Sequence, residues 1–110
     1  MPSTYRVLGQ LEPAAITAST LYTVPASRSA IVSTINVANT GNSQDIIRIA
    51  IRPAGATLAD QHYIAFGVPV PVGSVFTMTM GITLATTDVI TVYSTTGFSA
   101  FNAFGSEVVV

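Results

Sequence analysis

The sequence predicts an all-β fold: a single-domain antiparallel β-sandwich or jelly roll of about seven or eight strands, with little or no helix. Apolar and polar residues alternate with a period of two in several segments, as they do on strands with one buried face. Short segments rich in Gly, Pro, Asn and Ser separate these runs at fairly even intervals. No segment shows the sustained 3.6-residue apolar stripe of an amphipathic helix.

The alternation is clearest around three isoleucines. Ile47, Ile49 and Ile51 share one face of a predicted strand, while Arg48 and Arg52 lie on the other face. Val, Ile, Thr and Tyr fill the other runs, and these side chains suit a pleated, half-buried surface. The predicted strands are residues 5–10, 16–24, 29–39, 45–52, 61–66, 74–80, 88–94 and 98–104.

Turn-forming residues mark the boundaries between these strands. Residues 40–43 (Thr-Gly-Asn-Ser) have hairpin composition and are expected to join the strands on either side of them. Residues 53–56 (Pro-Ala-Gly-Ala) predict a second turn. Residues 68–73 contain two prolines, so this segment is expected at a sheet edge or in a loop. The one helical candidate is a single turn at residues 57–61.

The composition indicates a protein that works inside an assembly. Its 110 residues, 1–110, suffice for one core and show no linker or internal repeat. Only 8% of the residues are charged, against roughly a quarter in an average soluble domain. There is no lysine, and the net charge is −1, so little electrostatic repulsion keeps copies apart. We therefore expect a homo-oligomer, with a trimer favoured.

Several classes of partner are not expected. No apolar run approaches the roughly 18 residues of a membrane span. The four arginines form no basic stripe of the kind that binds nucleic acid.

The chain has no cysteine, which removes disulfides and zinc–sulfur sites. No secretory leader is recognisable, which predicts synthesis in a cytoplasm.

Catalysis has one weak candidate. His62, the only histidine, follows Asp60 by two residues, and on a strand these side chains would share a face. A metal site or catalytic dyad would need a second histidine, a cysteine or clustered acids, and no Gly-x-Ser-x-Gly elbow is present. We expect no enzyme activity, no metal and no cofactor, and a structural or interface role for His62.

The outward arginines are candidates for interface contacts. Arg48 and Arg52 could pair with Asp60, Glu107 or a carboxylate of a partner, because the planar guanidinium binds carboxylates in a bidentate fashion. The alternative is that both arginines only add solubility.

Two further candidates lie near the end of the sequence. Alternation places Phe101 opposite Phe98 and Phe104, so one of the three could be exposed. Phe101 is therefore either part of a core next to a β-bulge or an aromatic anchor in a subunit interface. The apolar triplet Val108, Val109 and Val110 would fray if free, so we expect it to pair with a sheet of its own subunit or of a neighbour.

The tyrosines distinguish two kinds of binding protein. If Tyr5, Tyr22, Tyr63 and Tyr93 gather on one exposed face with polar neighbours, they would form the stacking platform of a carbohydrate-binding, lectin-like module. If they are buried at subunit contacts, a structural role is favoured.

The order of several short motifs resembles one family. The chain is similar to small structural proteins of tailed bacteriophages over nearly its whole length. The motifs that carry this resemblance are LYTVPA (21–26), AIVSTINVAN (30–39), RIAIRPAGA (48–56), HYIA (62–65), GITL (81–84), TDVITVY (87–93) and FGSE (104–107).

The resemblance implies a virion component made in the cytoplasm of a host bacterium, and it carries over no catalytic residue. A single β-domain without a coiled-coil stalk suits a capsid decoration or cement protein that binds the major capsid protein where shell subunits meet. The alternatives are an adaptor in the tail, neck or baseplate, bound to tail proteins, or a fibre-tip domain.

Overall fold

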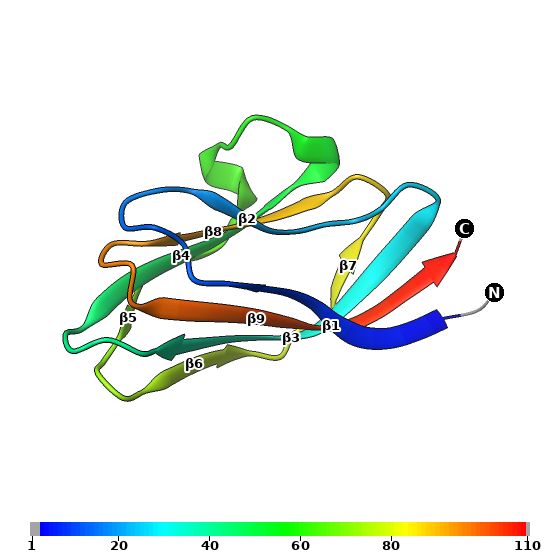
Figure 1. Cartoon of the computed structure of the whole chain (residues 1–110). Coiled ribbons are helices and arrows are strands. Elements are labelled where there is room, and N and C mark those ends of the chain that lie inside the picture. Colours follow the sequence, from blue (N-terminus) through cyan, green and yellow to red (C-terminus); the bar gives the residue numbers. More distant parts are fainter. Residues whose placement is uncertain (1–2, 110) are drawn as a thin grey trace.

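The computed structural model describes residues 3–109, which form strands and two short 3₁₀ turns but no α-helix (Figure 1). This confirms the predicted all-β class. The elements in chain order are β1 (Ser3–Leu11), β2 (Ser19–Thr23), β3 (Arg28–Asn39), β4 (Asp45–Arg52), η1 (Pro53–Gly55), η2 (Asp60–His62), β5 (Tyr63–Val70), β6 (Val75–Met78), β7 (Ile82–Leu84), β8 (Val89–Ser94) and β9 (Ser99–Val109).

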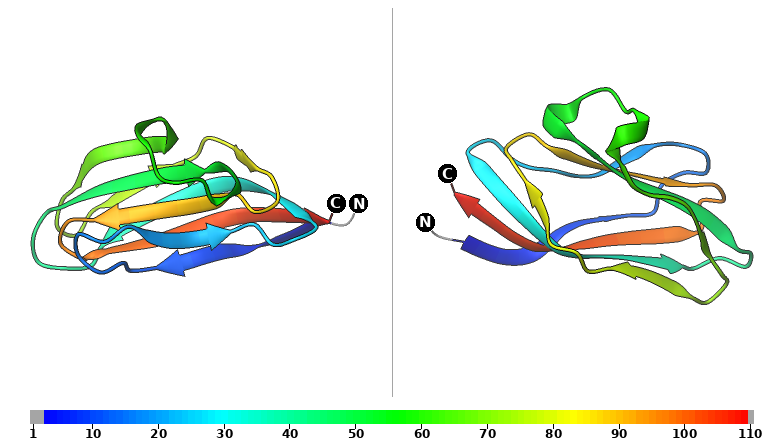
Figure 2. Two further views of the ribbon diagram at one scale, coloured as in Figure 1. Left: turned by 90° about the horizontal axis from the view of Figure 1, so that it is seen from above. Right: turned by 180° about the vertical axis from the view of Figure 1, so that it is seen from behind.

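The strands form two antiparallel sheets. The first sheet has the order β1-β9-β3-β6, and β7 also pairs with β3. The second sheet has the order β2-β8-β4-β5. Figure 2 shows the sheets as two layers, with the segment that holds η1 and η2 over the outer face of the second sheet. The architecture is therefore a sandwich, as the sequence predicts.

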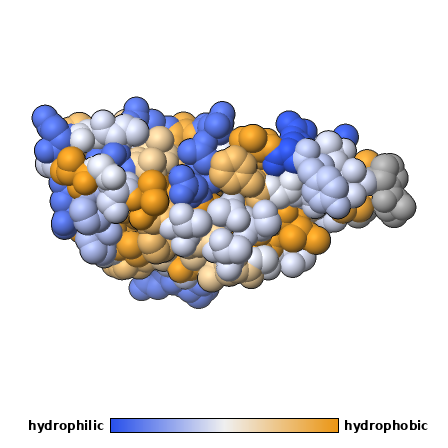
Figure 3. All heavy atoms as spheres, turned by 90° about the horizontal axis from the view of Figure 1, so that it is seen from below, coloured by the Kyte–Doolittle hydropathy of each residue, from blue (hydrophilic) through white to orange (hydrophobic). Residues whose placement is uncertain are grey.

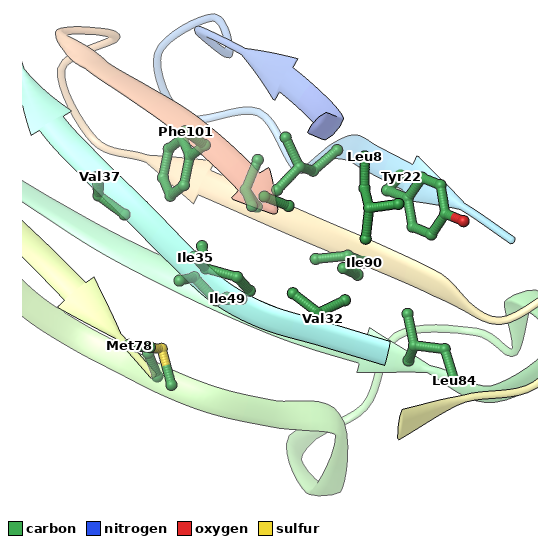
Figure 4. Close-up of a cluster of buried hydrophobic side chains, with 14 of the residues drawn as sticks. Leu8, Tyr22, Val32, Ile35, Val37, Ile49, Met78, Leu84, Ile90 and Phe101 are labelled. Atoms are coloured by element: carbon green, nitrogen blue, oxygen red, sulfur yellow. The ribbon is translucent and has the colours of Figure 1, made fainter. Parts of the chain in front are cut away.

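The core fills the space between the sheets with aliphatic side chains together with Met78, Tyr22 and Phe101 (Figure 4). A bulge between β3 and β9 maintains this packing on β3, because the register shifts between Val32 and Thr34. Ser33 is the extra residue; it is exposed, and its hydroxyl donates a hydrogen bond to the carbonyl of Phe104. Val32 and Ile35 are thus both fully buried, although residues three positions apart point to opposite faces of a regular strand.

Three details differ from the sequence prediction. Residues 40–43 do not close a hairpin: they carry the chain from β3 in the first sheet to β4 in the second. The helical turn lies at Asp60–His62 rather than at 57–61. The short strand β7 adds a ninth strand within residues 3–109. Residues 53–56 do turn, as a 3₁₀ turn in which Ala54 has a left-handed φ of 53°.

The proline-rich segment lies where its composition predicts. Pro69 belongs to β5, which forms an edge of the second sheet and pairs only with β4 among the described strands. Proline has no N–H to donate. A central strand is hydrogen-bonded to a neighbour on each side, whereas an edge strand has one unpaired side and therefore accommodates proline.

Buried Asp45 anchors the crossing from β8 to β9. Its carboxylate accepts hydrogen bonds from the hydroxyls of Ser94, Ser99 and Thr95, and from the backbone N–H groups of Thr95 and Thr96. Burial by itself would raise the pKa of Asp45, but these hydrogen bonds stabilise the carboxylate and lower the pKa to about 2. The residue is therefore a structural anion that fixes the loop between the sheets.

Candidate functional site

A stack of aromatic rings around one arginine marks the outer face of the second sheet. Arg48 on β4 pairs in register with Phe66 on β5 and with Tyr93 on β8, so the three side chains form one row across the sheet. The guanidinium carbon lies 4.4 Å from the centroid of each ring. Such cation–π contacts hold the guanidinium of Arg48 between the two rings.

A β-bulge brings a third aromatic ring, that of Tyr63, next to this row. On a regular strand Tyr63 and Phe66, three residues apart, would point to opposite faces. The register between β4 and β5 shifts so that Ile64 is an extra residue, which places both rings on the outer face. Their centroids are 4.9 Å apart with an interplanar angle of 80°. At the next shift Gly67, with φ of 69°, returns Val68 to the core side.

These rings border an open depression on the protein surface. Asp60, Tyr63 and Phe66 line it, and its volume is about 280 Å³. Phe66 is 60% exposed there, which is unusual for so large an apolar side chain. The 3₁₀ turn that presents Asp60 is closed by His62, whose Nδ1 accepts a hydrogen bond of 3.1 Å from the Ala59 N–H. His62 and Asp60 therefore belong to one turn, and they do not share a strand face as expected.

The outer face of the first sheet is different, because it carries no charge in the described residues. We call it the uncharged face; it consists of the outward side chains of β1, β9, β3, β6 and β7. The charged residues of these strands, Arg6, Arg28 and Glu107, all lie on the inner side. Its outward residues include Ser3, Tyr5, Val7, Gln10, Ser29, Ile31, Asn36, Ala38, Val75, Thr77, Thr83, Ala100, Asn102, Phe104, Ser106 and Val108.

Two rows on the uncharged face show its character. One row is polar: the Gln10 amide donates to Asn102 at 2.8 Å, and the Thr77 hydroxyl donates to Asn36 at 2.9 Å. In the other row, Ser106 on β9 pairs with Tyr5 on β1 and with Ile31 on β3. The side chains of these two neighbours are largely exposed, Tyr5 at 85% and Ile31 at 48%. Viewed from below, the molecule shows apolar groups among polar ones (Figure 3).

Arg48 and Arg52 do not contact either of the two partners expected within the chain, Asp60 and Glu107. Arg48 contacts aromatic rings, and Arg52 donates from Nε to the Thr91 hydroxyl and from Nη1 to the Ala56 carbonyl. Neither reaches Asp60 or Glu107, since β4 is in the second sheet and Glu107 points inward from the first.

Glu107 pairs instead with two other arginines. Its Oε1 lies 3.1 Å from Arg6 and 3.5 Å from Arg28. The pattern of the sequence did not single out these residues, because the register of β1 and β3 against β9 is what brings them together.

Phe101 is a core residue, which corrects its assignment as an interface anchor. It is fully buried and pairs with Leu11 and Val37 on the inner side of the first sheet. The alternative reading, a core position near a β-bulge, describes it correctly.

The C-terminal residues are paired, as predicted, and the sheet is their own. Val108 pairs with Ser3 and with Ser29, and Val109 pairs with Arg28. Val110 lies outside the described residues.

The four tyrosines do not form one cluster. Tyr5 is on the uncharged face and Tyr22 is buried, whereas Tyr63 and Tyr93 lie on the outer face of the second sheet with Arg48 between β5 and β8. Sequence reasoning missed Phe66, which completes that group.

Comparison with known proteins adds no assignment: no protein-family model matches the chain, and no curated protein is significantly similar to it. Within residues 3–109, no helix is long and apolar enough to cross a membrane. In the same part of the chain, no three His, Cys, Asp or Glu side chains gather as they would around a metal ion. The two outer sheet faces are therefore the features from which a function can be argued.

Proposed function

We propose that this protein is a non-enzymatic structural component of a phage virion, and specifically a capsid decoration or cement protein that binds the major capsid protein. The observation that carries this proposal is the uncharged face: a sheet surface with large exposed apolar side chains and no charged residue. The order of short motifs in the sequence resembles that of small structural proteins of tailed bacteriophages, and this resemblance supports the assignment to a virion.

The uncharged face suits attachment by burial of apolar surface. Val75 is 61% exposed and Tyr5 85%, and no charged side chain on this face must lose its hydration when a partner covers it. Burial contributes about 25 cal/mol per Å², so several hundred Å² outweighs exposed ion pairs worth about 0–1 kcal/mol each. The free energy of ordering reduces the net gain but leaves burial as the main attractive contribution.

The proposed geometry places the first sheet on the particle and the second sheet outward. A symmetric shell repeats the contact at every equivalent position, so a modest contact per copy stabilises the whole particle. A homo-oligomer, with a trimer favoured, would cover further apolar surface between copies. A tail, neck or baseplate adaptor, or a fibre-tip domain, would use the same face against another virion protein.

The test is retention of the protein on particles. We expect attachment to survive a wash in roughly molar salt, where the Debye length is about 3 Å, and to weaken in mild denaturant. Release by salt alone would contradict the proposal, because it would show that charged contacts hold the protein. The position of the protein in images of the native particle separates the shell from the tail and the neck.

A matched pair of variants tests which face is used. Ile31→Lys adds a charge to the uncharged face, and Thr20→Lys adds the same charge to an exposed position on β2 of the second sheet. We expect Ile31→Lys to reduce occupancy on particles by about tenfold or more, and Thr20→Lys to leave it unchanged. Equal occupancy of the two variants would refute docking through the first sheet.

A further inference from the structure

We infer that the depression on the outer face of the second sheet is a binding site for one pyranose ring of a neutral carbohydrate. The inference rests on Asp60, Tyr63, Phe66 and Arg48, and it goes beyond the proposed function. It does not depend on the uncharged face, because the two surfaces lie on opposite sides of the sandwich.

The aromatic rings supply a surface for the apolar side of a sugar ring. The C–H groups of a pyranose pack against an aromatic face, and Phe66 is 60% exposed at the depression. Arg48 at 4.4 Å and Tyr63 at 4.9 Å hold the Phe66 ring in place. A ring that is already fixed loses little conformational freedom when a ligand binds.

Asp60 supplies the polar contact that a sugar needs. An ionised carboxylate only accepts hydrogen bonds, and adjacent sugar hydroxyls can donate to its two oxygens. Asp60 is exposed at the depression, and among residues 3–109 no arginine or histidine lies within ion-pair distance of it, so its carboxylate is open to a ligand.

The charges around the depression favour a neutral ligand. Asp60 lines the depression, and Arg48 stacks on Phe66 and on Tyr93. The negative and positive charges offset each other, so the site has no net attraction for an ion of either sign. A polyol has neither charge, yet offers both C–H groups and hydroxyls.

The size and opening fit one ring of a longer chain. About 280 Å³ lies just below the range of roughly 300–1,000 Å³ for small-molecule sites that enclose a whole ligand. Because the depression is open, the neighbouring sugar units of an oligosaccharide can remain in solvent.

The backbone of β5 departs from regular geometry at this place. The register shifts at Ile64 and at Gly67 bracket Phe66, and Gly67 takes a left-handed conformation. Bulges re-aim side chains beside binding sites, and local irregularity concentrates where function requires it. Here the bulge at Ile64 is what aligns Tyr63 with Phe66.

The experiment is a titration of the full chain, labelled with ¹⁵N, with three neutral probes: maltotriose, cellotriose and tri-N-acetylchitotriose. We expect saturable shifts of backbone amides in residues 60–66 with at least one probe, at millimolar concentration. Phe66→Ala and Asp60→Asn should each weaken that binding by about tenfold. Both side chains are exposed, so the variants should keep the wild-type spectrum elsewhere.

Phe104→Ala is the matched control, since it removes an exposed phenylalanine from the uncharged face. It should leave sugar binding unchanged. The inference is overturned if none of the three probes gives saturable shifts in residues 60–66, or if Phe104→Ala weakens binding as much as Phe66→Ala. It is also overturned if Phe66→Ala lowers attachment to particles without any response to sugar, which would make the depression a protein contact.

Discussion

Tyr22 and Glu107 join the two sheets: the Tyr22 hydroxyl on β2 donates a hydrogen bond of 2.5 Å to Oε2 of Glu107 on β9. Both side chains are buried. Oε1 of the same carboxylate faces Arg6 and Arg28, so Glu107 links four strands of the sandwich. Burial, together with the hydrogen bond to Glu107, raises the pKa of Tyr22 far above that of a free phenol.

Tyr22→Phe should lower the free energy of unfolding by about 1–2 kcal/mol, because it removes a buried donor from a carboxylate. Arg6→Ala should cost less, about 0–1 kcal/mol, since the Arg6 side chain is half exposed and its ion pair is screened by solvent. Urea unfolding measures both. If Arg6→Ala costs more than Tyr22→Phe, the inter-sheet hydrogen bond is not the main stabilising contact of Glu107.

Asp45 should make the protein less stable in acid. Its pKa is 3.8 as a free side chain and about 2 in the folded protein, so the unfolded chain binds its proton first as the pH falls. The stabilisation is complete above pH 3.8, is lost as the pH falls to about 2, and amounts to about 2 kcal/mol. Asp45→Asn should lose this amount or more at neutral pH.

The measurement for Asp45 is the difference in unfolding free energy between wild type and Asp45→Asn as a function of pH. We expect the difference to shrink between pH 3.8 and about 2. A difference that stays constant over this interval would show that the carboxylate charge contributes nothing to stability.

Gly105→Ala and Gly9→Ala should each destabilise the fold by about 3 kcal/mol or more, because the strands leave no room for a methyl group. An added Cβ would lie 2.0 Å from the Ile31 carbonyl oxygen at Gly105 and 2.2 Å from the Leu21 carbonyl oxygen at Gly9. Gly73→Ala is the control: its φ is 68° but the space around it is open, so we expect a cost of about 1 kcal/mol. Thermal unfolding that ranks Gly73→Ala with the other two would contradict the packing found at Gly9 and Gly105.

Ending the chain at Glu107 should leave a folded protein that attaches poorly to particles. The truncation removes the pairing of Val108 with Ser3 and Ser29, and with it an apolar residue of the uncharged face. We expect a lower melting temperature, retained strand content in circular dichroism, and reduced incorporation. Incorporation equal to that of the full chain would show that these valines are dispensable for attachment.

Local alternation was sufficient to predict eight of the nine strands within residues 3–109. In β4 the residues Ile47, Ile49 and Ile51 alternate with Arg48, Ala50 and Arg52, and the strand has the predicted bounds, Asp45–Arg52. The short strand β7, Ile82–Leu84, escaped prediction because three residues are too few to show a period.

The arrangement of the strands could not be read from local pattern. The residues at 40–43 suit a hairpin as well as a loop that passes between sheets, and only the packing of β3 and β4 in different sheets decides between them. The depression lined by Tyr63 and Phe66 was not predicted from the sequence for a related reason. Tyr63 and Phe66 belong to opposite faces of a regular strand, and the bulge at Ile64 that reverses one of them depends on pairing with β4.

The pairing of β1 with β9 determines when the chain can fold during its synthesis. Arg6 and Glu107 form an ion pair although 101 residues separate them in the sequence. β9 lies between β1 and β3, so until the ribosome has made β9, β1 has no partner in the sheet and β3 is paired only on its other side, with β6 and β7. Pairing over such long distances is slow, and strands with open edges are prone to aggregate meanwhile. Nascent copies are therefore most vulnerable to aggregation during translation, before the first sheet can close.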